Sequence, residues 1–241
     1  MTRPILVLMM IALLTGCGRK AAQTSTLQPK AFGSALVEVS GGKQVAPVGT
    51  PVDQPLVVQV NDDKGAAVPG ALVSFQVNGD AVVTPPEGLT GSDGQLSTIV
   101  ALGTESGHYQ VVAATRDKSG KAIELKSDQI ALGYQQILGR QLNDRYCSRC
   151  HDSESSAERV SNHDNLKAAP HAFSDGAFLN KMSDADLAAI IGHGGPAVNK
   201  SPEMPPYAGT LQKAEIEALI AYIRAVADPP YHLKGLVYAK D

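Results

Sequence analysis

The sequence predicts two domains in tandem, an all-β sandwich followed by an all-α domain. Short alternating or β-branched runs recur between Ser34 and Leu132, with turn residues such as Asp93-Gly94 between them. From Tyr134 to Asp228, apolar residues instead recur with a helical period around a Cys-x-x-Cys-His pentapeptide. A chain of 241 residues has room for both domains.

The composition is that of a globular protein with nearly balanced charge. The chain has 21 Lys and Arg against 24 Asp and Glu, and its 43% hydrophobic content can form packed cores. A nucleic-acid-binding protein would carry a basic stripe or patch. The sequence therefore predicts no nucleic-acid partner.

Residues 1–16 are predicted to be a signal peptide. Arg3 precedes the apolar run Ile5–Leu14, which is too short to span a bilayer and suits a signal-peptide core. The following stretch, Leu14-Thr15-Gly16-Cys17, resembles the lipobox of bacterial lipoproteins. The resemblance implies cleavage before Cys17 and acylation of this residue, and two or more acyl chains anchor a protein stably to a membrane. A plain signal peptide with an incidental cysteine is the alternative.

Residues 17–33 are predicted to form the lipidated cysteine and a flexible tether, because the segment is small, polar and without period. The expected location is the bacterial cell envelope, with the protein lipid-anchored outside the cytoplasm. Gly18 follows the lipid cysteine, and the sorting rule of some Gram-negative bacteria then favours the outer membrane.

Residues 34–132 are predicted to form the sandwich. The strand-like runs are ALVEV, LVVQV, ALVSFQV, LSTIVAL, YQVVAAT and AIELK. The stretches LVVQVNDDKGAAVPGALVSFQV and GSDGQLSTIVAL resemble a bacterial immunoglobulin-like domain of the invasin/intimin type. This resemblance implies an antiparallel sandwich that acts as a spacer or docking module. His108 is predicted to be a surface strand residue.

The segment YCSRCH, from Tyr146 to His151, contains two of the three cysteines. With Cys17 assigned to lipid, Cys147 and Cys150 remain, and His151 follows directly. Cys-x-x-Cys-His is the attachment signature of c-type haem. Both thiols then bond to the haem vinyl groups, and the histidine ligates the iron.

Two other uses of this cysteine pair stay open at the level of sequence. A zinc site would need a further ligand such as His163 or His171, although their spacing fits no finger pattern. A thioredoxin-like thiol pair would need a βαβ unit, whereas the flanks have helical patterns. Both are less favoured than haem.

Met204 is the candidate ligand for the other face of a haem. Pro205-Pro206 follows it and stiffens the backbone beside it. After Thr210, an amphipathic helix is indicated by apolar residues at helical spacing, namely Ile216, Leu219, Ile220 and Ile223.

Residues 134–228 resemble the class I cytochrome c family through GRQLNDRYCSRCH and MPPYAGTLQKAEIEALIAYIRAVA. The resemblance implies an all-α cytochrome c domain with one covalent haem c, whose iron His151 and Met204 ligate. It also implies that the first helix crosses the last at Gly139 and Tyr222. The carbonyl oxygen of Pro170 is expected to hold the proximal histidine. Asn143 departs from the family, which often has an aromatic residue there.

Other residues compete for the distal position. Met182 lies just before a helix that Ser183 is predicted to cap, and core packing is its expected role. His193, in IIGHGGPA, would give a bis-histidine haem. His163 and His171 are expected to be solvated.

The expected function is that of a membrane-tethered, single-haem electron carrier that meets redox protein partners in weak encounters. Residues 229–241 form a tail that could fold back or bind a partner. The alternatives are an adhesive or assembly subunit of an oxidoreductase complex, and a haem sensor or enzyme with a labile distal ligand. The sequence leaves the oligomeric state open.

Overall fold

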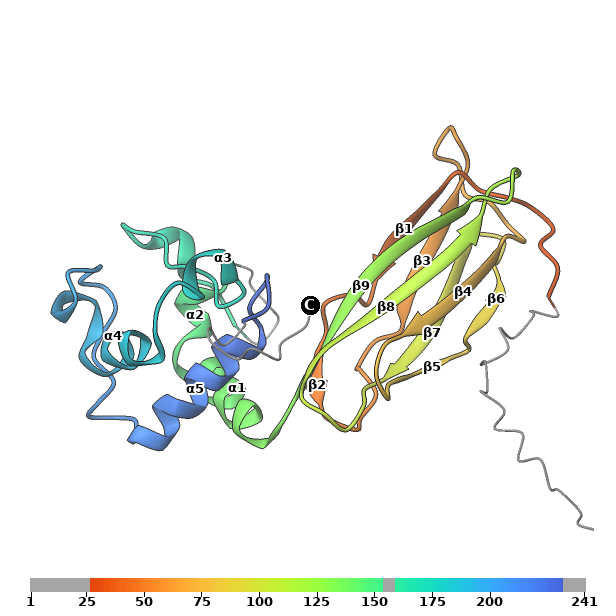
Figure 1. The fold of residues 1–241 in the computed structure, drawn as a ribbon. Coiled ribbons are helices and arrows are strands. Elements are labelled where there is room, and N and C mark those ends of the chain that lie inside the picture. Colours follow the sequence, from red (N-terminus) through yellow and green to blue (C-terminus); the bar gives the residue numbers. More distant parts are fainter. Residues whose placement is uncertain (1–26, 154–158, 232–241) are drawn as a thin grey trace, which may run out of the picture.

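The computed structural model describes residues 27–153 and 159–231 (Figure 1). The predicted signal peptide, Cys17 and most of the C-terminal tail lie outside this part of the chain. The described residues form a β-sandwich followed by a helical domain. No helix within these two ranges has the length and apolar character needed to cross a membrane.

Two sheets make up the sandwich. The first has four strands in the order β1-β3-β7-β5, and the second has five in the order β2-β9-β8-β4-β6. The strands are β1 (Ala35–Ser40), β2 (Val45–Pro47), β3 (Leu56–Asn61), β4 (Leu72–Val77), β5 (Val82–Thr84), β6 (Glu87–Leu89), β7 (Gln95–Ala101), β8 (Gly107–Arg116) and β9 (Ala122–Leu132).

All six predicted strand segments are strands in the structure. The three strands that the sequence did not predict, β2, β5 and β6, have three residues each, which is too short for an alternating pattern to be visible. The sandwich is also not wholly antiparallel, because β2 pairs in parallel with β9 at one sheet edge.

The core of the sandwich follows directly from alternation along the strands. Leu56, Val58 and Val60 on β3 are fully buried, and Val73 and Val111 on the opposing sheet are buried with them. Each such side chain contributes roughly 1.5–3 kcal/mol by leaving water. In the part of the chain that the structure describes, the sandwich has no disulfide, and packing holds it together.

The helical domain contains α1 (Tyr134–Tyr146), α2 (Ser148–His151), α3 (Gly176–Leu179), α4 (Asp184–Ala197) and α5 (Lys213–Ala225). Helices α1 and α5 cross at Gly139, where an added Cβ atom would lie 2.0 Å from the carbonyl oxygen of Ala218 and 2.7 Å from Cβ of Tyr222. The predicted contact between Gly139 and Tyr222 is confirmed. Ser183 caps α4 as predicted, accepting a hydrogen bond from the backbone N–H of Asp186.

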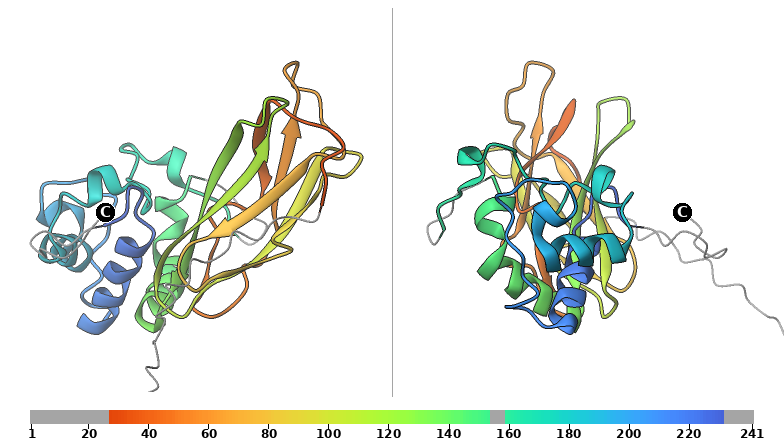
Figure 2. Two further views of the ribbon diagram at one scale, coloured as in Figure 1. Left: turned by 45° about the vertical axis from the view of Figure 1, so that its right-hand side comes forward. Right: turned by 90° about the vertical axis from the view of Figure 1, so that its left-hand side faces the viewer.

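The two domains meet without a linker. Strand β9 runs to Leu132, Gly133 follows, and α1 begins at Tyr134. In Figure 2 the helices lie at one end of the sandwich. A buried cluster of Ile130, Leu132 and Val226, which we call the interdomain cluster, joins the two domains.

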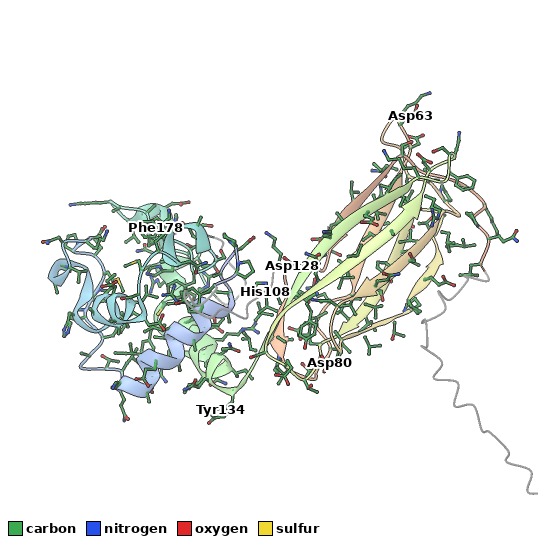
Figure 3. All side chains as sticks on the ribbon, in the orientation of Figure 1. Asp63, Asp80, His108, Asp128, Tyr134 and Phe178 are labelled. Carbon is green, nitrogen blue, oxygen red and sulfur yellow. The ribbon has the colours of Figure 1, made fainter. Side chains whose placement is uncertain are left out.

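His108 lies on strand β8 as expected, but it is half-buried against the helical domain rather than on the open surface. Its Nε2 atom lies 3.0 Å from the carbonyl oxygen of Ala225 in the helical domain. Figure 3 shows His108 at the end of the sandwich that faces the helices. The sequence could not predict this, because the burial comes from the neighbouring domain. Asn143, the residue that departs from the cytochrome pattern, is buried and lines the cavity between the domains.

Candidate cofactor site

A cavity of about 300 Å³ lies inside the helical domain, and we call it the cofactor cavity. Its walls come from the end of α1, α2, the loop before α3, and helices α3, α4 and α5, together with the loop between α4 and α5. The walls are mostly apolar, with Phe178, Leu187, Ile191, Leu219 and Ile223 among the lining residues.

Cys147 and Cys150 both line the cofactor cavity. Cys147 lies between α1 and α2, and its carbonyl oxygen accepts hydrogen bonds from the backbone N–H groups of Cys150 and His151, each at 3.0 Å. This tight turn places both cysteines on one side of the backbone, since residues three apart are neighbours on a helix. Both are free thiols.

The Cys147 thiol is buried, and this burial raises its pKa to about 12, with the neighbouring Cys150 contributing in the same direction. A redox-active thiol pair instead needs a thiolate at neutral pH, which positive groups or a helix N-terminus stabilise. The segments that flank the pair are helices α1 and α2, and not the βαβ unit that a thioredoxin-like site needs.

His151 lies on α2 and is held in one orientation. Its Nδ1 atom lies 2.8 Å from the carbonyl oxygen of His171, and a carbonyl oxygen can only accept, so Nδ1 carries the proton. Burial lowers the pKa of His151, which favours the neutral ring. The neutral tautomer leaves the lone pair of Nε2 available to a metal ion.

The expected hydrogen-bond acceptor for His151 was the carbonyl oxygen of Pro170, but in the structure the acceptor is the carbonyl oxygen of His171. Pro170 still lines the cofactor cavity. The difference is one residue in an irregular loop, where no periodicity fixes which carbonyl faces the histidine ring.

The sequence also missed how this loop is anchored. The His171 ring stacks on Phe178, with centroids 3.6 Å apart, and its Nδ1 lies 2.8 Å from a carboxylate oxygen of Asp175. The hydrogen bond from His171 lowers the pKa of Asp175. Asp175 also caps α3 by accepting from the backbone N–H of Phe178. The spacing His-x-x-x-Asp before a helix was the available signal.

Met204 lines the same cavity, in a loop that packs on the end of α4. Helix α4 breaks at Gly194, whose φ is +76°, and the N–H of Gly195 donates to the carbonyl oxygen of Met204 at 3.0 Å. Further along, the Tyr207 hydroxyl donates to the carbonyl oxygen of Tyr146 at 3.0 Å. The loop is thus tied at one end to α4 and at the other to the start of the cysteine motif.

The competing ligands differ in position. Met182 also lines the cofactor cavity, so position alone does not remove it. His193 is exposed and is not among the residues that line the cavity. Within residues 27–153 and 159–231, no three His, Cys, Asp or Glu side chains are grouped as a metal site. The structure therefore does not bring His163 or His171 together with the cysteine pair as zinc ligands.

These residues fit a covalently bound haem. Cys147 and Cys150 would form the two thioether bonds, His151 would ligate through Nε2, and a methionine thioether is available in the same cavity. The apolar walls suit a large hydrophobic ring.

Comparisons with known proteins agree with this geometry. Residues 136–223 match the family model described as cytochrome c oxidase, cbb3-type, subunit III. No curated protein sequence matches the chain.

Solved structures similar to the chain include bacterial adhesin domains. The D00–D0 domain of intimin is 18% identical, with a TM-score of 0.33, over 46% of this chain and 51% of that one. The D0–D1 domain of intimin is 18% identical, with a TM-score of 0.34, over 43% of this chain and 49% of that one. The adhesin InvE of Yersinia pseudotuberculosis is 15% identical, with a TM-score of 0.36, over 42% of this chain and 33% of that one.

The chain spans about half the length of the intimin structures and a third of InvE. Because these TM-scores are low, the description of the N-terminal domain as a sandwich rests on its own strand topology and not on these structures. The protein combines an N-terminal all-β immunoglobulin-like region with a helical cytochrome c-type domain, and such a domain implies haem-based electron transfer.

Proposed function

We propose that the protein is a membrane-tethered cytochrome that carries single electrons between redox partners outside the cytoplasm. One haem c is bound through Cys147 and Cys150, with His151 and Met204 as axial ligands. A lipid on Cys17 anchors the chain, and the immunoglobulin-like region acts as spacer or docking module. The protein is an electron carrier rather than an enzyme.

The observation that carries the proposal is the convergence of four side chains on one apolar cavity. Cys147, Cys150, His151 and Met204 all line it, although Met204 lies more than fifty residues away in sequence. The hydrogen bond of Nδ1 to His171 leaves His151 ready to ligate through Nε2. When bound, a six-coordinate haem supplies reversible one-electron transfer.

Several of the residues around the cofactor cavity are buried apolar side chains. Leu187, Ile191, Leu219 and Ile223 are all buried and form apolar walls. A protected haem with a methionine ligand favours a higher reduction potential than one with histidine alone. These properties support electron transfer over substrate chemistry.

The chain enters and leaves the sandwich at opposite ends, and this arrangement supports a spacer role. The N–H of Lys30 donates to the carbonyl oxygen of Gly70 at 2.8 Å, so the chain enters at the start of β4. The helical domain joins at the opposite end, where Gly107 pairs with Ala131 at the base of the β8–β9 ladder. At about 3.4 Å per residue, β8 spans roughly 30 Å between these ends. A lipid-anchored chain would hold the haem at that distance from its tether.

The distal ligand is tested by the optical spectrum of the full-length holoprotein and of Met204→Ala. The oxidised wild type is expected to show the weak far-red band of sulfur–iron ligation, and Met204→Ala is expected to lose it. The reduced variant is then expected to bind carbon monoxide. Met182→Ala is the matched control, because Met182 lines the same cavity, and it is expected to keep the band. A band that disappears in Met182→Ala and persists in Met204→Ala would reverse the assignment.

The tether is tested by replacing Cys17 with serine in the full-length gene product. We expect the wild type to fractionate with membranes and the variant to appear in the soluble fraction, because a chain without acyl groups has no lipid anchor. Haem content is the control and is expected to be equal in both. Membrane association that survives the substitution would contradict lipid anchoring.

A second candidate is a subunit of an oxidoreductase complex, because the matching family model is named for a subunit of cbb3-type cytochrome c oxidase. Such a subunit is expected to co-purify with a larger complex and to exchange electrons poorly when it is isolated. A sensor or enzyme instead predicts that the wild-type reduced protein binds carbon monoxide.

A further inference from the structure

Two cavities meet at the proximal histidine. Besides the cofactor cavity, a cavity of about 390 Å³ lies between the sandwich and the helical domain, and we call it the interdomain cavity. Among residues 27–153 and 159–231, His151 and Phe173 are the two that line both of these cavities. These two side chains therefore form the partition between the cofactor site and the space beneath the immunoglobulin-like region.

Phe173 contacts both sides of this partition. Its ring centroid lies 4.7 Å from that of His151, at an interplanar angle of 37°. It also packs against the interdomain cluster, which includes Ile130 and Leu132 of the sandwich. The side chain that flanks the proximal ligand thus belongs to the same apolar cluster as Ile130 and Leu132 of strand β9.

The immunoglobulin-like region is fixed in this position by several contacts. Gly133 alone separates β9 from α1, which leaves no flexible linker. Nη1 of Arg140 donates to the carbonyl oxygen of Val45 at 2.7 Å, and His108 contacts Ala225. The ion pair between Lys43 and Asp228, at 3.6 Å, is exposed and adds little.

His108 lies at the interdomain cavity, whose lining also includes the charged side chains of Lys43, Asp128 and Asp152. Its Nε2 must be the donor to Ala225, because a carbonyl oxygen only accepts, and Nδ1 is then an acceptor. This Nδ1 atom is buried and has no hydrogen-bond partner among the described residues. A cavity of this size with a polar and charged lining is suited to hold water.

We propose that the immunoglobulin-like region is the outer wall of the proximal side of the cofactor site. Phe173 is a positioning residue that, together with His151, closes the cofactor cavity toward the interdomain cavity. Water near the iron favours the oxidised, more positively charged state, so this partition raises the reduction potential. The inference rests on the proposed haem function and assigns the immunoglobulin-like region a part in setting the potential.

The test is the reduction potential of full-length holoprotein variants, measured by spectroelectrochemistry. Phe173→Leu is expected to lower the potential, with a three- to tenfold shift in the electron-transfer equilibrium constant, or about 30–60 mV for one electron. Phe173→Tyr keeps the ring and is expected to restore most of the wild-type value. Ile130→Ala removes support from the sandwich side alone and is expected to lower the potential in the same direction.

Ile137→Ala is the matched control. Ile137 packs on the interdomain cluster but lines neither cavity, so its loss weakens domain packing without opening the partition. We expect an unchanged potential.

Two results would overturn the proposal: an unchanged potential in Ile130→Ala, or an equal shift in Ile137→Ala. Should Phe173→Leu fail to fold, Ile130→Ala still decides, because it leaves the helical domain intact. A wild type without covalent haem or far-red band would instead refute the proposed function.

Discussion

Replacing Gly139 with alanine is expected to destabilise the helical domain by up to about 2 kcal/mol. An added Cβ atom would lie 2.0 Å from the carbonyl oxygen of Ala218, which is backbone and cannot rotate away. Helices α1 and α5 would have to separate, and overpacking of this kind costs about 1–3 kcal/mol. The higher helix propensity of alanine recovers only about 1 kcal/mol.

Denaturant unfolding of the holoprotein, followed by haem absorbance, measures this loss. Gly209→Ala is the control in the same domain, since a Cβ atom there would meet no atom within 4 Å. It is expected to unfold at the wild-type denaturant concentration. Equal midpoints for Gly139→Ala and Gly209→Ala would show that the helices do not cross as closely as described.

Replacing Gly195 with alanine is expected to release the distal loop and abolish the far-red band while covalent haem is retained. A Cβ atom at this position would lie 1.9 Å from the carbonyl oxygen of Ser201. The clash pushes apart α4 and the loop that carries Met204, and the hydrogen bond from Gly195 to Met204 is lost with it. Because Cys147 and Cys150 are untouched, haem attachment should be unaffected.

Optical spectra and carbon monoxide titration of the reduced variant measure this effect. Gly192→Ala is the matched control within the same motif, because the nearest atom to its added Cβ is Cβ of Ala208, at an ordinary 3.9 Å. The control is expected to keep the band and to exclude carbon monoxide. An intact far-red band in Gly195→Ala would contradict the proposed role of α4 in holding Met204.

Much of the fold could be predicted because its signals are local. The alternation of β3 and the helical period of α5 are properties of single segments, and both are confirmed. Strands β2 and β6 carry no such signal and exist only because a neighbouring strand offers hydrogen bonds along its edge. Short edge strands are therefore a product of tertiary pairing.

The cofactor site shows the same division. The cysteine pair and His151 lie in one short segment, where spacing alone indicates the chemistry. The acceptor for His151 lies in an irregular loop, and sequence reasoning chose Pro170 where the structure has His171. His193 was a competing ligand, whereas the structural role of the glycines that follow it is to let the Met204 loop approach α4.

The sequence by itself determined the strand alternation, the cysteine motif and the amphipathic period of α5, and the resemblance to cytochromes c implied that α5 crosses α1 at Gly139. Each is written in spacing along one segment, and hydrophobic burial enforces such spacing wherever the segment packs. Only the tertiary structure decided that His108 contacts the helical domain, that Phe173 lies between two cavities, and that the sandwich rests against the proximal side. Those features depend on atoms brought together from both domains, and no local periodicity encodes contacts between them.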